Sequence, residues 1–431
     1  MKFYSTNNNS NKVSFNEALI EGMPLDNGLY MPEFIPDHSK LIKGISSLNI
    51  KDISYVIANS YLNQDFKNSD IEEIIDYSIT FDSPLVNIFN NIQILELFHG
   101  PTLAFKDFGA RFMARTMEKI VSNKDKELNI LVATSGDTGS AVANGFYNVE
   151  GINVIILYPS KKVSYIQEKQ LTTLGGNIFA LEIDGSFDEC QALVKKAFLD
   201  LNLKKKINLS SANSINIARL IPQTFYYFNA YSKVKNKNNV VISVPSGNFG
   251  NVTAGLLSKK MGLPIAKFIA STNKNKTVPD FIENGVYKPY KTIQTISNAM
   301  DVGNPSNIKR ILDIYKNSDN LKQDMFSWSY DDDKTIGIIK KILNDFKYIL
   351  DPHSAVGLLG LENYAKYDNS FNGIFLGTAH PSKFLDIIEP EINKKIKVPD
   401  RLNDVLDKEK KSLFMKNDYE DFSNYLLENF I

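Results

Sequence analysis

Short runs of β-branched and other apolar residues alternate with helical patterns along most of the chain from about residue 129 onward. Most of these runs are followed by a Gly, Ser or Asn turn and then by apolar residues at helical spacing. The runs are "NILVAT" (129–134), "INVIILYP" (152–159), "NIFALEI" (177–183), "NVVISVP" (239–245), "AKFIAST" (266–272) and "GIFLGTA" (373–379). Such alternation indicates parallel sheets covered by helices, so the pattern predicts an α/β protein.

Two segments depart from this alternation. Residues 1–95 contain amphipathic segments such as "DIEEIIDYSITF" but little strand signal, which predicts a mainly helical N-terminal region. Residues from about 275 to 350 are charged and helical in pattern, and we interpret them as an insertion packed on the main fold.

Composition and charge exclude several classes of function. The chain has 431 residues, 43% of them hydrophobic, which is enough for a large core and more than one structural unit. Lys and Arg total 49, as do Asp and Glu, so no overall charge attracts nucleic acid or an anionic membrane. No apolar run approaches the ~18 residues of a membrane span, and no secretory leader opens the chain. We therefore expect a cytoplasmic protein without a nucleic-acid or membrane partner.

The positions of cysteine and histidine residues further limit the kinds of chemistry that the chain can support. The lone cysteine, Cys190, excludes an intramolecular disulfide framework and lies on an apolar row at helical spacing, which predicts a core position rather than a catalytic thiol. The histidines, at 38, 99, 353 and 380, have no metal-ligand spacing. We expect no metal.

The stretch "HGPTLAFKDFGARFM" (99–113) places Lys106 directly behind the apolar triplet Leu103-Ala104-Phe105 and ahead of a helical pattern. A lysine desolvated by apolar neighbours has a lowered pKa, and only its neutral amine attacks an aldehyde. The alternative is a lysine whose stem lies along a helix surface. Lys106 is therefore a candidate nucleophile whose role depends on the other motifs.

Two junctions between a strand and a helix are candidate anion sites. "VPSGNFGNVTAGLL" follows the run at 239–245, and Gly247 and Gly250 predict a loop with φ > 0 and close backbone approach, before a helix that opens near Asn251. "ATSGDTGSAVANGF" repeats this arrangement after the run at 129–134, with hydroxyls and amides that suit a carboxylate. The alternatives are an ordinary strand-to-helix turn in the first case and helix capping by Ser135 or Asp137 in the second.

Two further segments contain polar residues of interest. "NSINIARLIPQ" brings Asn213, Ser214 and Arg219 together near a helix start, and the planar fork of Arg suits a phosphate, although capping plus a surface Arg is the simpler interpretation. "FLGTAHPSKF" ends the last expected strand with Thr378 and His380. A reactive lysine, a phosphate loop without cations, a carboxylate loop and a hydroxyl at a strand end together describe a site for pyridoxal 5′-phosphate bound to an amino acid.

These motifs resemble those of a known enzyme family. "HGPTLAFKDFGARFM", "TSGDTGSAVA", "NSINIARL", "VPSGNFGNVTAG", "TISNAMDVGNPSN" and "GTAHPSKF" are similar to segments of the pyridoxal-phosphate-dependent threonine synthases, in the same order and over about residues 20 to 385. The resemblance implies a tryptophan-synthase-β-like fold in which two open parallel-sheet α/β domains enclose the cofactor, with the helical N-terminal region of the longer branch. The corresponding division is 1–95, a smaller domain at 96–235 and a larger domain at 236–431.

The resemblance also implies residue roles. Lys106 matches the lysine that binds the cofactor covalently, the loop Gly247, Asn248, Phe249, Gly250 and Asn251 matches the one that binds its phosphate, and Thr378 matches the hydroxyl that faces its pyridine nitrogen. The segment with Thr134, Ser135, Asp137 and Thr138 matches the substrate-carboxylate loop, and Asn213, Ser214 and Arg219 match contacts to the substrate phosphate. Asp137 stands where the shorter branch has Asn beside the phenolic oxygen of the cofactor, although the longer branch also has Asp there.

The implied reaction is that of a carbon–oxygen lyase acting on a phosphate, in which O-phospho-L-homoserine and water give L-threonine and phosphate. Two alternatives remain. One is another enzyme of the same fold, such as a dehydratase or a β-replacing synthase, and the other is a non-catalytic paralogue that binds phosphorylated ligands. The cluster from Asn213 to Arg219 favours a phosphorylated substrate over the first, and Lys106 together with the complete SGNFG loop favours catalysis over the second.

Overall fold

Two open sheets form the framework of the protein, and a computed structural model describes residues 1–121 and 127–431 of it. The larger sheet has six strands in the order β12-β11-β10-β13-β5-β4, all parallel except β4, which runs antiparallel to β5. Its strands are β4 (Leu85–Phe89), β5 (Ile92–Glu96), β10 (Val240–Pro245), β11 (Lys267–Thr272), β12 (Met325–Ser329) and β13 (Asn372–Gly377).

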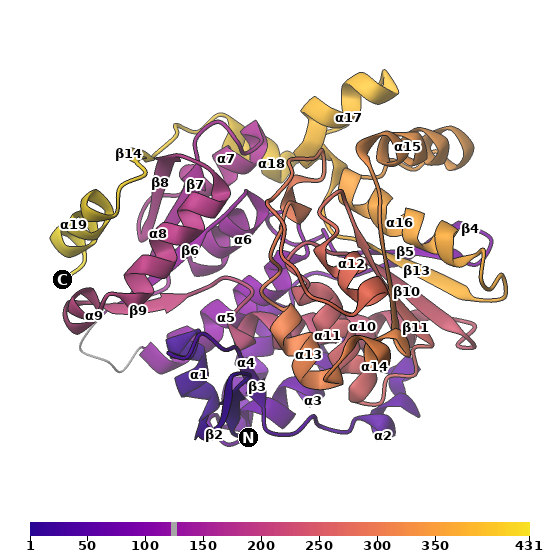
Figure 1. The fold of residues 1–431 in the computed structure, drawn as a ribbon, viewed down its shortest axis with the longest axis horizontal. Coiled ribbons are helices and arrows are strands. Elements are labelled where there is room, and N and C mark those ends of the chain that lie inside the picture. The colour runs from indigo at the N-terminus through magenta and orange to yellow at the C-terminus, as the bar shows by residue number, and fades with distance from the viewer. Residues whose placement is uncertain (122–126) are drawn as a thin grey trace.

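The smaller sheet is fully parallel, with five strands in the order β14-β8-β7-β6-β9. Its strands are β6 (Leu128–Ala133), β7 (Ile152–Pro159), β8 (Ile178–Asp184), β9 (Asn208–Ser211) and β14 (Leu413–Lys416). Figure 1 shows this sheet on the left of the molecule and the larger sheet on the right. The α/β class and the two-sheet architecture expected from the sequence are confirmed.

Each sheet buries both of its faces, because successive side chains of a strand point to opposite sides. In β6, Ile130 and Val132 enter the main core between the sheets, whereas Leu131 and Ala133 face a second core on the outer side. In β10, Ile242 lies in the main core and Val241 in an outer one. Strands buried on both faces are continuous apolar runs, which explains why the sequence pattern revealed them.

Helices form three groups around the sheets. The first packs in and below the main core: α1 (Phe15–Glu21), α2 (Ser39–Ile42), α3 (Ile50–Leu62), α4 (Asn68–Ser78), α5 (Lys106–Val121), α6 (Asp137–Phe146), α10 (Ile217–Lys233), α11 (Gly250–Lys260), α12 (Thr277–Asn284), α13 (Ile308–Tyr315), α14 (Ser318–Lys322) and the short 3₁₀ helix η1 (Ile45–Ser47). The second covers the outer face of the larger sheet: α15 (Asp332–Phe346), α16 (Pro352–Tyr364) and α17 (Leu385–Ile392). The third lies on and around the smaller sheet: α7 (Tyr165–Thr172), α8 (Phe187–Leu199), α9 (Leu201–Lys206), α18 (Asp400–Leu406) and α19 (Tyr419–Asn429).

The N-terminal region contains a small sheet that the sequence pattern did not indicate. Strands β1 (Phe3–Ser5), β2 (Asn8–Val13) and β3 (Tyr30–Pro32) pair in the order β2-β1-β3. Strand β2 is largely exposed and consists mostly of Asn, Ser and Lys, so its backbone pairing leaves no hydrophobic signature. The expectation of little strand structure before residue 95 was wrong here, and it was also wrong for β4 and β5.

The six strands predicted from apolar runs are present, each displaced by at most two residues at either end. The segment expected to be a helical insertion, 275–350, also supplies β12, which pairs in parallel with β11 at the edge of the larger sheet. Near the C-terminus, β14 returns to pair with β8 of the smaller sheet. The chain thus passes between the two sheets more often than a division at residues 95 and 235 implies.

Two other observations concern the single cysteine and the helices. Cys190 of α8 is fully buried in the outer core of the smaller sheet, and burial raises the pKa of its thiol to about 12. Within the described ranges, none of the helices combines the length and the apolar character that crossing a bilayer requires.

Candidate functional site

A cavity opens between the two sheets, where the carboxyl ends of their strands approach each other. Ligands of open α/β folds bind at this edge, because loops and helix N-termini converge there. Every candidate site residue from the sequence lines this one cavity: Lys106, Thr134, Ser135, Asp137, Thr138, Asn213, Ser214, Arg219, Gly247, Asn248, Phe249, Gly250, Asn251 and Thr378.

Lys106 is the first residue of α5 and is held against the end of β13. The backbone N–H of Phe105 donates to the carbonyl oxygen of Thr378 at 2.9 Å, and the N–H of His380 donates to the carbonyl oxygen of Leu103 at 3.0 Å. Leu103 adopts φ 58°, a left-handed conformation that turns the chain into α5. Lys106 is therefore fixed beside Thr378 by backbone contacts.

The electrostatic surroundings of Lys106 favour a neutral amine. Burial lowers the pKa of the Lys106 ammonium to about 8; the negative charge of Asp137 opposes this shift, and the positive charges of Lys383 and Arg219 add to it. About a tenth of the amine is thus unprotonated at pH 7, far more than for an ordinary lysine, as a nucleophile or base requires.

The loop that follows β10 ends at the N-terminus of α11, and no side chain caps that helix. Helix N-termini present backbone N–H groups without partners inside the helix, which suits an anion. The expectation of φ > 0 at Gly247 and Gly250 was wrong: the left-handed residue of the loop is Phe249, with φ 60°. Gly250 already has the helical conformation of the first turn of α11, and Phe249 makes the bend before it.

Close packing explains why position 247 is a glycine, although the neighbour is another segment of the protein and not a ligand. A Cβ atom on Gly247 would lie 2.6 Å from the Cα atom of Met300 and 3.0 Å from the carbonyl oxygen of Ala299. Asn248 binds the same part of the chain, because its Oδ1 accepts from the N–H of Ser306 at 2.6 Å. The loop after β10 is thus packed against the segment around residue 300.

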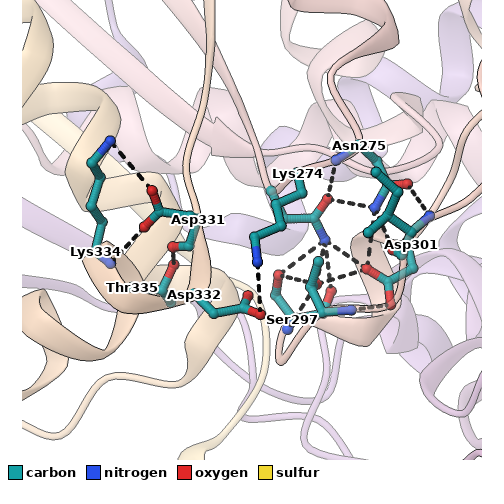
Figure 2. Close-up of polar contacts among 11 residues, drawn as sticks. Lys274, Asn275, Ser297, Asp301, Asp331, Asp332, Lys334 and Thr335 are labelled. Carbon is teal, nitrogen blue, oxygen red and sulfur yellow. Dashed lines mark hydrogen bonds and ion pairs between the residues drawn. The ribbon is translucent and has the colours of Figure 1, made fainter.

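A hydrogen-bond network in turn anchors this segment. One carboxylate oxygen of Asp301 accepts from the side chains of Asn273 at 2.8 Å and Thr295 at 2.7 Å, and the other accepts from the N–H of Thr295 at 3.0 Å. Figure 2 shows Asn275, Ser297 and Asp301 facing one another, while Lys274 points toward Asp332. Burial raises the pKa of Asp301 to about 6 despite these hydrogen bonds.

The loop between β6 and α6 is built around Thr134, whose Oγ1 accepts from the N–H groups of Gly136 at 3.0 Å and Gly139 at 2.8 Å. Gly136 precedes α6 with φ 135°, a conformation that side chains disfavour, and it caps the helix without a side-chain bond. The alternative of capping by Ser135 or Asp137 is therefore not what the structure shows. Both residues instead line the cavity.

The segment before α10 holds several polar groups together. Asn216 caps the helix by accepting from the N–H of Ala218. Ser214 Oγ accepts from Asn248 Nδ2 at 2.6 Å, which joins this segment to the loop after β10. Asn213 Nδ2 donates to the carbonyl oxygen of Ala133 at 2.9 Å.

Arg219 is buried rather than a surface residue, with 3% of its surface exposed. Its NH1 group donates to the carbonyl oxygen of Ala212 at 2.6 Å, and its Nε has no hydrogen-bond partner among the described residues. Burial lowers the pKa of its guanidinium to about 10, which leaves the group cationic at neutral pH. The negative charge of Asp107 opposes this shift, and an anionic ligand in the cavity would stabilise the guanidinium further.

Two residues near the site were not identified from the sequence. His353 lines the cavity, accepts from the N–H of Ala299 through Nε2 at 3.2 Å, and contacts Asp351 through Nδ1 at 2.8 Å. Lys383 is fully buried and forms a 2.7 Å ion pair with Asp137. His353 lies in "DPHSAVGLL" and Lys383 in the segment "FLGTAHPSKF" quoted above, but no local spacing signals their contacts.

The residues around the cavity fit pyridoxal 5′-phosphate. Its aldehyde requires a lysine with an accessible neutral amine, which Lys106 provides, and its phosphate requires donors such as those at the uncapped N-terminus of α11. Asn251 adds an observation from the structure: its Oδ1 accepts from Tyr226 and Tyr227, whereas its buried Nδ2 has no partner in the described part of the chain. An acceptor-rich ligand in the cavity would satisfy such a donor.

Comparison with known proteins gives the same assignment. Residues 91–372 match the family model described as pyridoxal-phosphate dependent enzyme, residues 2–79 match threonine synthase N terminus, and residues 354–426 match threonine synthase, C-terminal. A threonine synthase of Haemophilus influenzae is 42% identical over 431 residues, covering 100% of both chains.

Solved structures agree. The crystal structure of threonine synthase from Escherichia coli has 40% sequence identity and a TM-score of 0.94, covering 99% of this chain and 100% of the other. That of threonine synthase from Brucella melitensis with bound pyridoxal phosphate has 31% identity and a TM-score of 0.92, covering 100% of this chain and 99% of the other.

The two parallel sheets and the lysine in the cavity between them define a pyridoxal-phosphate-dependent enzyme of the tryptophan-synthase-β-like fold. Its N- and C-terminal regions match family models of one branch of this class, and its sequence identity to a member of that branch extends over the whole chain. The chain belongs to the threonine synthases.

Proposed function

We propose that the protein converts O-phospho-L-homoserine and water to L-threonine and phosphate, and that the cavity residues have the roles given below. The observation that supports this most strongly is that two groups suited to an anion line the same cavity as Lys106. One is the uncapped N-terminus of α11, and the other is the buried guanidinium of Arg219. A phosphorylated cofactor together with a phosphorylated substrate requires two such sites.

The first site would hold the cofactor. The backbone of Gly247, Asn248, Phe249, Gly250 and Asn251 would donate to its phosphate, Lys106 would bind its aldehyde carbon, and the hydroxyl of Thr378 would face its ring nitrogen. When bound, pyridoxal 5′-phosphate supplies an electron sink for charge that develops on the amino acid. Thr378 is neutral, so it does not enforce protonation of the ring nitrogen as a carboxylate partner would.

The second site would orient the substrate. Thr134, Ser135 and Thr138 surround the loop before α6, where hydroxyl and N–H donors suit a carboxylate. Asn213, Ser214 and Arg219 would bind the phosphate at the other end of the substrate, and the guanidinium would stabilise the negative charge on the departing phosphate. Binding at both ends fixes Cα near Lys106.

Lys106 is the group that would move protons. With a pKa of about 8, its amine can accept the Cα proton and transfer protons at the neighbouring carbons before water adds at Cβ. Asp137, the first residue of α6, would adjust the charge around this amine rather than contact the substrate phosphate.

The test is an assay of the purified protein with pyridoxal 5′-phosphate and O-phospho-L-homoserine. Phosphate and threonine should appear in equal amounts, and homoserine without its phosphate should give no threonine. Release of ammonia and a keto acid from serine or threonine, without turnover of phosphohomoserine, would instead indicate a dehydratase. Binding of phosphohomoserine without either product would indicate a non-catalytic paralogue.

A further inference from the structure

Lys383 is a buried cation to which the proposed function assigns no role. It belongs to the 3₁₀ helix η3 (Pro381–Phe384), which follows β13, and none of its surface is exposed. Its Nζ lies 2.7 Å from Oδ1 of Asp137 and donates to the carbonyl oxygen of Thr102 at 2.9 Å. A fully buried ammonium is costly unless it is paired and hydrogen-bonded, as it is here.

These contacts join parts of the chain that belong to different sheets. Asp137 begins α6 after β6 of the smaller sheet, whereas Lys383 follows β13 of the larger sheet. Thr102 lies four residues before Lys106 in the chain. Ser164, which caps α7, donates to the carbonyl oxygen of Lys383 at 3.1 Å. Lys383 therefore links the substrate-side loop, the segment before Lys106 and the end of β13.

Asp137 is the residue that Lys383 and Lys106 share electrostatically. Burial alone would raise the pKa of the Asp137 carboxyl, but the charges of Lys383 and Lys106 and a 2.9 Å hydrogen bond from Gln167 hold it well below its usual range. Asp137 lies at ion-pair distance from Lys383 but, among the residues that the structure describes, not from Lys106. The Asp137 carboxylate thus pairs with Lys383. Within the described ranges, the amine of Lys106 has no salt bridge.

We propose that Lys383 is a positioning residue that holds the Asp137 carboxylate away from Lys106 and balances its charge, so that the amine of Lys106 is free to react. This rests on the proposed role of Lys106. It explains how an ionised aspartate can begin α6 beside the reactive lysine: without Lys383, the cation left to act on Asp137 would be Lys106 itself. A longer-range consequence is that the site is complete only when both sheets are in place.

The test measures Lys106 directly, in the full-length protein freed of its cofactor. The rate at which acetic anhydride acetylates Lys106 is followed against pH by peptide mass spectrometry, which gives the apparent pKa of the amine. Lys383→Met should raise that pKa by about one unit or more, because a cation is lost and Asp137 becomes available to Lys106. Asp137→Asn should lower it. Lys340→Met, which removes an exposed ion pair with Glu391, is the matched control and should change nothing.

A purely structural role for Lys383 would reduce stability without moving the titration of Lys106, so an unchanged pKa in folded Lys383→Met protein would overturn the proposal. If that variant does not fold, Lys383→Gln takes its place, because it removes the charge but keeps a hydrogen-bond donor for Asp137 and for the carbonyl oxygen of Thr102. Lys383→Gln should also raise the pKa of Lys106, and an unchanged value would also overturn the proposal. The measurement needs no turnover, so its failure is separate from failure of the threonine synthase assay.

Discussion

At the scale of single residues, the site depends on charged side chains placed where water solvates them poorly. Lys106 and Arg219 both have pKa values lowered by burial, to about 8 and about 10 respectively. The same physical effect has different consequences, because an amine with a pKa of about 8 is partly neutral near pH 7 whereas a guanidinium with a pKa of about 10 stays charged. This difference suits Lys106 to chemistry and Arg219 to anion binding.

The role of Lys106 can be tested by trapping. Borohydride treatment of the protein with pyridoxal 5′-phosphate should attach the cofactor to the peptide that contains residue 106, because only a neutral and accessible amine forms the reducible link. Peptide mass spectrometry locates the label. Lys106→Ala should lose it, and a label on any other lysine would show that the assignment is wrong.

The role of Arg219 can be tested by kinetics. A charge-assisted hydrogen bond contributes about 1.5 to 3 kcal/mol, so Arg219→Ala should lower kcat/KM for O-phospho-L-homoserine about 10- to 150-fold. Arg219→Lys should recover only part of this, since an ammonium lacks the planar fork. Cofactor occupancy, measured by visible absorbance, is the control and should be unchanged, because the cofactor phosphate is assigned to another loop. Loss of the cofactor, or near-normal turnover, would contradict the division of the two phosphate sites.

At the scale of elements, the loop after β10 functions together with the segment around residue 300. Gly247 lies against the backbone of Met300, and His353 of α16 accepts from the N–H of Ala299. The Asp301 network holds that segment from the other side. The loop after β10, to which we assign the cofactor phosphate, is therefore positioned by a neighbour that lies more than 40 residues later in the chain.

Gly247→Ala tests this packing. The added Cβ would meet the Met300 backbone at 2.6 Å, so one of the two segments must shift. Overpacking of this kind costs about 1 to 3 kcal/mol, and cofactor affinity should fall about 5- to 150-fold. Gly337→Ala, in α15 with no atom within 4 Å of the added Cβ, is the control and should leave the cofactor dissociation constant unchanged. Equal affinity in both variants would refute the argument.

Asp301 predicts a pH dependence with a definite sign. Its pKa is raised by burial from an ordinary 3.8 to about 6, so the folded state binds the proton more tightly. The stability that this gives is fully present below about pH 4 and is lost as the pH rises through about 6. Relative to Asp301→Asn, which does not titrate, the wild type should therefore lose free energy of unfolding between about pH 4 and 7, as measured by urea unfolding.

Asp368 supplies the control of opposite sign. Hydrogen bonds from the backbone and side chain of Ser370 and from Asn239 lower the pKa of this partly exposed carboxyl. Its stabilising contribution should be present above its unfolded pKa and should disappear as the pH falls. If the wild type minus Asp301→Asn difference followed the direction of Asp368 or stayed flat, the raised pKa of Asp301 would be wrong.

At the scale of the whole molecule, the C-terminal segment belongs to the smaller sheet although it follows the larger one in the chain. Strand β14 pairs with β8, and Phe422 of α19 is fully buried with Leu181 and Cys190 in the outer core of that sheet. Figure 1 shows β14 and α19 at the far side of the smaller sheet, away from the rest of the late chain. This return ties the last residues to the smaller sheet, which also supplies β6 and the loop before α6.

Phe422→Ala tests the contribution of this segment. Removing a buried phenyl group leaves a cavity and should lower the free energy of unfolding by about 3 to 5 kcal/mol, as measured by denaturant unfolding. Phe414→Ala is the matched control, because Phe414 of β14 is 59% exposed and should have little effect. Similar losses in the two variants would mean that the C-terminal segment does not depend on this core.

The apolar runs along the chain predict much of the architecture, and this prediction needs no knowledge of tertiary contacts. They located six strands of the two sheets, and the loops after β6 and β10 followed from the glycines and hydroxyls at the ends of those runs. Hydrophobic patterning has this power because burial on both faces of a parallel strand leaves an uninterrupted apolar run. Exposed or edge strands leave no such record, which is why β2 and β12 were not anticipated.

The tertiary structure alone decided how separate segments meet at the site. The pairing of Asp137 with Lys383, the contact of Gly247 with Met300 and the bond from Ala299 to His353 join residues between 53 and 246 positions apart in the chain. Local spacing reports which face of an element is buried, but not which distant side chain it meets there. That Lys106 matters could be inferred from its apolar neighbours and the motifs around it, whereas the charges that leave its amine free come together only when both sheets have folded.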